Sequence, residues 1–552
     1  MIFQDYMYIQ ILFFILALLF IGREVWKTRS YPEKQDKTHL YITQLVLVIG
    51  IIVRLYNLDY MDGANLDEAM AGYEAWCLGN FGIDSHMTSF PVYMKVWGSG
   101  MSALYIYMAA PFVKLFGLSE GVFRLPMSLL GSFAILFFYW VLRKTQKDTL
   151  LTATMTCILA ICPWHIMKSR YGLDAMVAPD LILIGVCFII LACYLTVNWQ
   201  RCTAYILGFG ILALSAYGYA VSWVVLPVLV VALFIYLLKK KLITTKQIAG
   251  SIGVMLLIAW PLIYFAGVMY LGFGEVKVGA MTIPQLEFNR ADDTGTFILS
   301  SNNILNEIKI SIPVIAKLIL LGTDGISNEI AIPYFGVFYN VISLPLLGYG
   351  IWYFFRSKDR SNSEDILFIM LASASVLLIL IGASLVHWNL LWLPFSIFSG
   401  YGIYYFTKSF SPAKGLFLST FSILFLLFLL AYFNAKTFKP GFTYYSHMIK
   451  QSVLFVRDKD FDKIYYPRDI VHSTVLFFDP VDPYTFAKTV KKTGESIQIA
   501  DSYANVEFGL PEQIIPQKNT AYVVSNAMVG NINLEGFNVD RNAYYTILWN
   551  KD

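Results

Sequence analysis

Apolar runs long enough to cross a bilayer as helices follow one another along most of the chain. A membrane-spanning helix needs about 20 residues that are mainly apolar. Such runs lie at residues 7–26, 40–58, 122–142, 149–166, 175–197, 203–220, 222–238, 247–270, 333–355, 365–386, 388–407 and 414–433. The pattern predicts a mainly α-helical, polytopic membrane protein with about 12 transmembrane helices.

Two further apolar segments fit better along the membrane surface than across it. If residues 102–118 formed a crossing, basic loops that should share one side would fall on opposite sides. Residues 307–321 are interrupted by Glu307, Lys309 and Lys317. We therefore expect both segments to form outer juxtamembrane helices.

The basic loops between the spans predict the orientation, because Lys and Arg concentrate on the cytoplasmic side of a membrane. These loops lie at residues 23–37, 143–147, 198–201, 239–246, 356–360 and 408–414. All of them share one side if each predicted span crosses once. On the outer side of the membrane then lie the N-terminus, a first loop at 59–121, a short loop at 165–174, a second large loop at 271–332 and the C-terminal tail.

The composition agrees with a membrane protein. The 552 residues are 57% hydrophobic and 14% charged, with a mean hydropathy of +0.60, whereas soluble domains are roughly 45–50% apolar and 25% charged. The net charge of +4 is small for this length and points to no nucleic-acid partner. The six cysteines lie mostly in apolar runs without CxxC spacing, which is typical of buried thiols rather than disulfides or metal ligands.

The composition changes from about Ala435, where Lys, Asp and Pro occur at frequencies typical of soluble domains. Short β-rich runs at Lys463–Tyr466, Thr474–Phe478 and Ala521–Val524 predict strands. We expect residues 435–552 to form a small extracytoplasmic α/β domain. The rest divides into an extra N-terminal helix with a cytoplasmic loop at 1–39, and a transmembrane domain at 40–434 that contains the loops 59–121 and 271–332.

Two adjacent carboxylates, Asp67 and Glu68, stand out in the first outer loop. One interpretation is a helix start, with Asn65 as N-cap, Glu68 completing a capping box and Asp67 facing the helix dipole. The other is functional, since adjacent acids beside a bilayer cost solvation energy unless they are paired or used. The local sequence leaves both interpretations open.

Cations on the outer loops favour a site for an anion. They are Lys95, Arg124, Arg170 and Arg290, and a lipid phosphate is the anion that such a membrane-surface cluster would bind. Each cation also has a structural alternative. Arg124 could snorkel at a helix end, Lys95 could be solvated, and Arg170 could pair with Asp174.

These features together resemble the GT-C membrane glycosyltransferases, and within them the family-39 branch of protein O-mannosyltransferases and bacterial aminoarabinose transferases. The resemblance covers roughly residues 40–240. It rests on Arg54 at the outer end of a helix, the Asp67-Glu68 pair opening a long external loop, the stretch Lys95 to Gly100, the stretch Leu104 to Gly117, and Phe123-Arg124-Leu125-Pro126 opening the next helix. The first helix and the C-terminal tail depart from the usual pattern.

The resemblance implies an inverting transferase that moves a monosaccharide from a polyprenyl-phosphate donor to a hydroxyl outside the cell membrane. By position, Asp67 would be the catalytic carboxylate and Glu68 its neighbour in the motif. The donor phosphate would be bound by Lys95 and Arg170, with Asp174 and Arg124 in support. Arg290 joins the phosphate ligands on the predicted topology, because it falls in the second large outer loop. The acceptor would be a cell-envelope glycan, a teichoic-type polymer or a protein.

Two other functions stay open on the sequence. One is a polytopic lipid or sugar transporter, although ionisable residues are scarce in the middle of the spans and no internal repeat is apparent. The other is a non-catalytic envelope assembly protein. The sequence identifies no certain cofactor. It leaves a divalent cation open, for which Asp67 and Glu68 without a third ligand would make a poor site.

Overall fold

The computed structural model describes residues 6–59, 63–96, 99–287, 298, 304–324, 330–332, 334–434, 442–493 and 499–550. The chain forms two compact units. The first contains residues 1–56, 124–264 and 291–437. The second contains residues 57–123, 265–290 and 438–552. The first outer loop thus shares a unit with the C-terminal segment.

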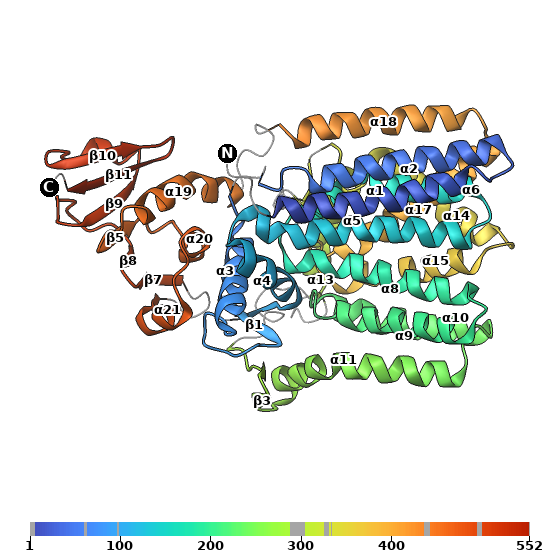
Figure 1. Cartoon of the computed structure of the whole chain (residues 1–552), viewed down its shortest axis with the longest axis horizontal. Coiled ribbons are helices and arrows are strands. Elements are labelled where there is room, and N and C mark those ends of the chain that lie inside the picture. Colours follow the sequence, from blue (N-terminus) through green and yellow to red (C-terminus); the bar gives the residue numbers. More distant parts are fainter. Residues whose placement is uncertain are drawn as a thin grey trace. The chain divides into compact units, whose positions relative to one another are not determined.

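The first unit is built from helices (Figure 1). They are α1 (Met7–Thr28), α2 (Lys34–Leu55), α5 (Glu120–Thr145), α6 (Thr149–Ala160), α7 (Pro163–Lys168), η1 (Asp174–Met176), α8 (Val177–Tyr194), α9 (Asn198–Ser215), α10 (Ser222–Lys239), α11 (Thr245–Leu271), α13 (Ile304–Leu321), α14 (Asn340–Arg356), α15 (Asn362–Ala374), α16 (Leu377–Leu380), α17 (Asn389–Ser409) and α18 (Ala413–Tyr432). The first residues of α5 and the last of α11 belong to the second unit.

Each predicted span overlaps at least one helix, and the span at 365–386 is divided into α15 and α16 and ends in non-helical residues. In the described part of the chain, eight helices are long and apolar enough to cross a membrane, namely Met7–Thr28, Lys34–Leu55, Glu120–Thr145, Asp174–Tyr194, Ser222–Lys239, Thr245–Leu271, Asn362–Leu380 and Ala413–Tyr432. This confirms a mainly α-helical, multi-pass membrane protein. The predicted span at 149–166 is divided into α6 and α7, where Pro163 begins the second helix.

Close helix packing in the first unit depends on residues without a side chain. Helix α14 packs against α17, and α17 also packs against α6. A methyl group at Gly350 would lie 2.6 Å from the carbonyl oxygen of Phe398, and one at Gly402 would lie even closer to the α14 backbone. Small residues let helix backbones approach in this way inside membranes.

The second unit combines helices with a seven-stranded sheet, among the residues that the structure describes. Its elements are α3 (Leu66–Phe81), β1 (Tyr93–Val96), β2 (Ser99–Ser102), α4 (Leu104–Phe116), β3 (Val276–Val278), β4 (Met281–Ile283), α19 (Phe442–Arg457), β5 (Lys463–Tyr466), α20 (His472–Phe478), α21 (Pro483–Thr489), β6 (Lys491–Thr493), β7 (Ile499–Tyr503), β8 (Val506–Phe508), β9 (Thr520–Ser525), η3 (Val529–Asn531), β10 (Phe537–Arg541) and β11 (Tyr545–Asn550). The sheet order is β10-β11-β9-β5-β8-β7-β6, with β5 parallel to β8 and β9. This confirms the small α/β fold at the C-terminus.

One predicted strand is wrong. Residues Thr474–Phe478 belong to helix α20, which begins at His472 and is buried over its whole length. A short, continuously apolar run has no alternation that would distinguish a strand from a buried helix. The strands predicted at Lys463–Tyr466 and Ala521–Val524 are confirmed as β5 and as part of β9.

The first outer loop contains the expected short helices. Helix α3 begins directly after Asn65, where one interpretation of the sequence placed a helix start, and α4 lies within the apolar segment 102–118. The 13 residues of α4 extend about 20 Å, less than the roughly 30 Å of a hydrocarbon core. Helix α3 packs against α20, and Gly72 leaves no room for a side chain beside the Phe477 ring.

Candidate active site

The carboxylate pair lies in the first turn of α3. Asn65 is the N-cap, and its Oδ1 accepts a hydrogen bond of 2.9 Å from the Asp67 backbone N–H. This confirms Asn65 as the N-cap, although its hydrogen bond comes from Asp67 and not from the capping box predicted with Glu68. The Asp67 side chain is half-buried, whereas Glu68 is fully buried. Asp67 therefore lies near the partial positive charge of a helix N-terminus, which stabilises a carboxylate.

The segment that leads into α3 is held in place by two other parts of the second unit. Glu120 accepts a hydrogen bond of 3.1 Å from the Gly63 backbone N–H and pairs with Lys450 at 2.6 Å. The Ala64 backbone N–H donates to the Ser446 hydroxyl at 2.9 Å. Glu120 and helix α19 thus fix the start of α3, and neither stood out in the sequence.

Lys95 belongs to the same unit as Asp67 and Glu68. It lies on β1, and its Nζ is 3.7 Å from a carboxylate oxygen of Glu275. Both side chains are partly exposed, at 32% and 47%. An exposed pair of this kind contributes little to stability, so Lys95 can exchange Glu275 for another anion at low cost.

Arg170 lies in the first unit and is buried. Its Nη1 donates to the Val53 carbonyl oxygen at 2.8 Å and also contacts the Tyr56 carbonyl oxygen. Its Nε donates to the Tyr432 hydroxyl at 2.9 Å. A cation at these carbonyls stabilises the negative end of the α2 dipole, immediately before the chain enters the first outer loop.

The other predicted residues also fall in the first unit or outside the described residues. Asp174 begins η1, and its Oδ1 accepts a hydrogen bond of 2.7 Å from the Ala175 backbone N–H. Arg124 is fully buried on α5, so the interpretation that it snorkels is wrong, and Arg54 on α2 is fully buried as well. Arg290 lies outside the described residues.

A buried ionic network in the core of the first unit explains how Arg54 can be buried. Its Nη2 lies 2.8 Å from His165 Nδ1, and its Nη1 donates to the Ala160 carbonyl oxygen at 2.9 Å. Arginine only donates, so His165 Nδ1 accepts, and the His165 Nε2–H donates to Asp180 at 3.0 Å. Lys168 also pairs with Asp180. The predicted outer loop at 165–174 is therefore buried, and its lone histidine has partners on both ring nitrogens.

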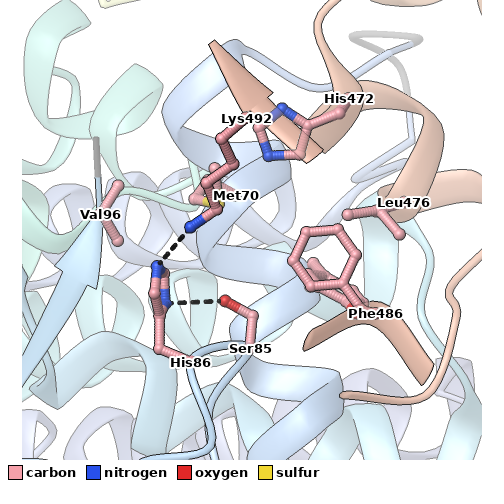
Figure 2. A pocket seen from close by; sticks show the side chains of 9 residues that line it. Met70, Ser85, His86, Val96, His472, Leu476, Phe486 and Lys492 are labelled. Atoms are coloured by element: carbon pink, nitrogen blue, oxygen red, sulfur yellow. Dashed lines mark hydrogen bonds between the residues drawn. The ribbon is translucent and has the colours of Figure 1, made fainter. Parts of the chain in front are cut away.

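A second polar cluster surrounds a small pocket in the second unit, and no motif in the sequence pointed to it. Glu74 on α3 accepts hydrogen bonds from the Ser85 N–H, at 2.9 Å, and from the Ser85 hydroxyl. Ser85 Oγ lies 3.1 Å from His86 Nδ1, and His86 Nε2 lies 3.5 Å from Lys492 Nζ. Figure 2 shows Ser85 and Lys492 each hydrogen-bonded to one nitrogen of the His86 ring. Lys492 lies 406 residues after His86 in the chain, and Asp84-Ser85-His86 has no motif spacing.

Burial changes the protonation of this cluster. It raises the pKa of the Glu74 carboxyl well above its usual range, with the Asp84 carboxylate as the next cause. It also lowers the pKa of His86 to about 3 and that of His472 to about 4, with Lys492 adding to both effects. Both imidazoles are therefore neutral at physiological pH.

The raised pKa of Glu74 predicts a stability that depends on pH. The folded protein holds the Glu74 proton up to a pH of about 8, whereas an unfolded chain loses it near 4.3. Stability from this group is thus complete below about 4.3 and is lost as the pH rises through 8. We expect the thermal unfolding temperature to fall more between pH 7 and 8.5 in the wild type than in Glu74→Gln. An equal fall of the unfolding temperature in both proteins would contradict the raised pKa of Glu74. His86 and His472 do not contribute to the pH dependence above pH 7, because their pKa values are lowered.

Within the described residues, no group of three or more His, Cys, Asp or Glu side chains is placed to hold a metal ion. Asp67, Glu68 and Lys95 lie together in the second unit, and Arg124, Arg170 and Asp174 lie in the first. Each unit thus contains some of the predicted site residues.

Comparison with solved structures identifies the fold. The chain is similar to ArnT from Cupriavidus metallidurans bound to undecaprenyl phosphate, with a TM-score of 0.54, 15% identity, and coverage of 91% of this chain and 97% of that one. Apo ArnT from the same organism gives a TM-score of 0.53 at 14% identity, again covering 91% and 97%. No family model matches the sequence, and no curated protein sequence matches it. The chain has the fold of the GT-C membrane glycosyltransferases, as its motifs predicted.

Proposed function

We propose that the protein is an inverting glycosyltransferase that uses a polyprenyl-phosphate sugar. It would transfer one monosaccharide to a hydroxyl of a cell-envelope glycan, teichoic-type polymer or protein at the outer face of the membrane. The observation that carries this proposal is Asp67, half-buried in the capped first turn of α3, in a chain with the ArnT fold. The donor class is supported by the undecaprenyl phosphate bound to that ArnT structure.

In the proposed reaction Asp67 is the general base. Its carboxylate accepts the proton of the acceptor hydroxyl as the oxygen attacks the anomeric carbon, and the bond to the donor phosphate breaks. This single displacement inverts the configuration of the anomeric carbon. The leaving phosphate needs no acid, because it departs as a stable anion, so a single carboxylate is sufficient.

The cations have separate roles in this proposal. Lys95, partly exposed and only loosely paired with Glu275, binds the donor phosphate and stabilises its charge as it leaves. Arg170 adds positive potential from the end of α2, where it is held by backbone carbonyls. Arg290 is proposed as a third phosphate ligand on its sequence position. Glu68, Arg124 and Asp174, all buried, are proposed as supporting residues on their sequence positions.

The proposed orientation predicts a labelling pattern. In a variant without native cysteines, Met87→Cys and Ile499→Cys are expected to react with a membrane-impermeant thiol reagent on intact cells, because both positions are exposed and assigned to the outer side. Lys240→Cys, also at an exposed position, is expected to react only after the cells are opened. Reaction of Lys240→Cys in intact cells would contradict the orientation.

Mass spectrometry of a deletion strain tests the function. We expect a polyprenyl-phosphate sugar to accumulate and an envelope polymer or protein to lack one sugar residue, with both changes reversed by the restored gene. A transporter would instead leave a polyprenyl-phosphate sugar on the inner side, protected from reagents added to intact cells. An unchanged pool of lipid-linked sugars would reject the proposal.

A further inference from the structure

A large cavity lies in the first unit, at the ends of several of its helices. Its volume of about 510 Å³ is within the roughly 300–1,000 Å³ that is usual for ligand sites. Its walls come from the connections between α1 and α2, between α5 and α6, and between α17 and α18, together with the adjoining helix ends. These connections contain basic loops that the sequence predicts on the cytoplasmic side.

The charged side chains that line this cavity balance one another. They are three acids and three lysines, namely Glu33, Asp36, Asp148, Lys147, Lys408 and Lys414. An isolated anion would face three carboxylates here, and an isolated cation would face three ammonium groups. The lining therefore favours a ligand that carries one charge of each sign.

Part of this charge is already compensated within the protein. Asp148 pairs with Lys408 at 3.0 Å, and its Oδ1 caps helix α6. In the part of the chain that the structure describes, Lys147, Lys414 and Glu33 form no ion pair. Two ammonium groups and one carboxylate are thus available to a ligand.

Asp36 adds a second carboxylate, which helix α6 holds in place. The Thr149 hydroxyl donates to Asp36 Oδ1, so Thr149 Oγ1 accepts the His39 Nδ1–H at 3.1 Å. Asp36 lies in the first turn of α2, and Glu33 is the N-cap of the same helix. The two carboxylates can receive the N–H groups of a primary ammonium.

The first turn of α18 provides the complementary part of the cavity. Lys414 lies in that turn, which has no side-chain cap and no acidic residue. A helix N-terminus of this kind attracts an anion, and an ammonium group beside it adds to the attraction. Lys147 and the Ser411 hydroxyl also line the cavity. This part therefore suits a phosphodiester.

The surface that continues from Lys414 is the apolar face of a membrane-spanning helix. Helix α18 is long and apolar enough to cross a membrane, and only four of its 20 residues are buried. Leu416 and Leu418 follow Lys414 closely and are 63% and 51% exposed. A headgroup in the cavity would place its acyl chains along these leucines, as in other basic headgroup pockets between membrane helices.

We propose that this cavity binds the headgroup of a zwitterionic phospholipid with a primary amine, phosphatidylethanolamine. Its phosphodiester contacts Lys147 and Lys414, and its ammonium contacts Glu33 and Asp36. Phosphatidylglycerol has no ammonium for the two acids, and the quaternary ammonium of phosphatidylcholine has no N–H to donate. The site is separate from the proposed transferase function and does not depend on it.

Native mass spectrometry of the full-length protein in detergent tests the site. The protein receives equal amounts of phosphatidylethanolamine, phosphatidylglycerol and phosphatidylcholine with identical chains, and the lipid retained per protein is measured. We expect the wild type to retain about tenfold more phosphatidylethanolamine than either other lipid, which corresponds to one charge-assisted hydrogen bond. Lys414→Met should lower this retention by about the same factor. Glu33→Gln should remove most of the preference over phosphatidylglycerol.

Lys246→Met is the matched control. Lys246 is also the second residue of a membrane-spanning helix, α11, but it lies outside the cavity lining, so this variant should bind as the wild type does. Unfolding temperatures close to that of the wild type show that each variant is folded.

Four results would each overturn the site. They are equal retention of the three lipids by the wild type, undiminished retention in folded Lys414→Met, an unchanged preference in folded Glu33→Gln, and an equal loss in Lys246→Met. Displacement of the lipid by an equimolar amount of free glycerophosphoethanolamine would also overturn it, because a ligand without acyl chains would then be sufficient.

Discussion

Asp67→Asn is expected to reduce sugar transfer by roughly 100-fold to 10,000-fold, the usual contribution of a general base. The amide keeps the size of the side chain but accepts no proton from the acceptor hydroxyl. The loss of one charge in the first turn of α3 should cost only about 0.3–1 kcal/mol of stability. Transfer is measured as the sugar restored to the envelope of the deletion strain, per amount of folded protein in the membrane.

Asn65→Ala is the matched control for this variant. It removes the 2.9 Å hydrogen bond from the Asp67 backbone N–H to the cap, at a cost of about 1 kcal/mol, and leaves the Asp67 carboxylate in place. We expect transfer within a few-fold of the wild type. If both variants lose transfer only in proportion to lost protein, Asp67 is a helix-capping residue and the catalytic assignment is wrong.

Asp180→Asn is expected to give the largest loss of stability. Asp180 is fully buried and is the anion shared by His165 and Lys168. Without its charge, Lys168 and the nearby Arg54 remain in the core of the first unit with their counter-charge removed. Breaking a buried ion pair in this way costs about 3–5 kcal/mol. The yield of folded protein and its thermal unfolding temperature measure the effect.

A second substitution, at Lys168, is expected to restore most of the stability that Asp180→Asn loses. Lys168→Met combined with Asp180→Asn removes one charge of each sign and leaves the network with its original net charge, so we expect most of the stability to return. Asp365→Asn is the comparison, because Asp365 pairs with the partly exposed Arg360 at 2.9 Å, where the cost should be within about 1 kcal/mol. Equal losses for Asp180→Asn and Asp365→Asn would contradict the structural role of the buried network.

The sequence was a good guide where local pattern decides the structure. Runs of apolar residues predicted the helices of the first unit, and Asn65 predicted the start of α3. Local pattern did not separate the helix at His472–Phe478 from a strand, because burial on all sides removes the periodicity. This helix is determined by the residues that pack around it, not by its own sequence pattern.

Charged residues were harder to place from the sequence. Arg54 and Arg124 stand near predicted helix ends, where snorkelling costs least, yet both are fully buried. For Arg54 the partners are His165 and the Ala160 carbonyl, which lie more than 100 residues away. The pocket formed by His86 and Lys492 is a stronger case, because no local pattern links residues of the first outer loop with strand β6.

The most direct test of the proposed transferase uses purified protein. The wild type and Asp67→Asn are reconstituted into vesicles with lipid extract and envelope polymer from the deletion strain, and polyprenyl-phosphate sugar and free polyprenyl phosphate are followed by mass spectrometry. The account predicts that the wild type converts the first lipid into the second while adding one sugar to the polymer, and that Asp67→Asn does neither. Equal conversion by both proteins would contradict the role of Asp67, and no conversion by the wild type would contradict the proposed activity.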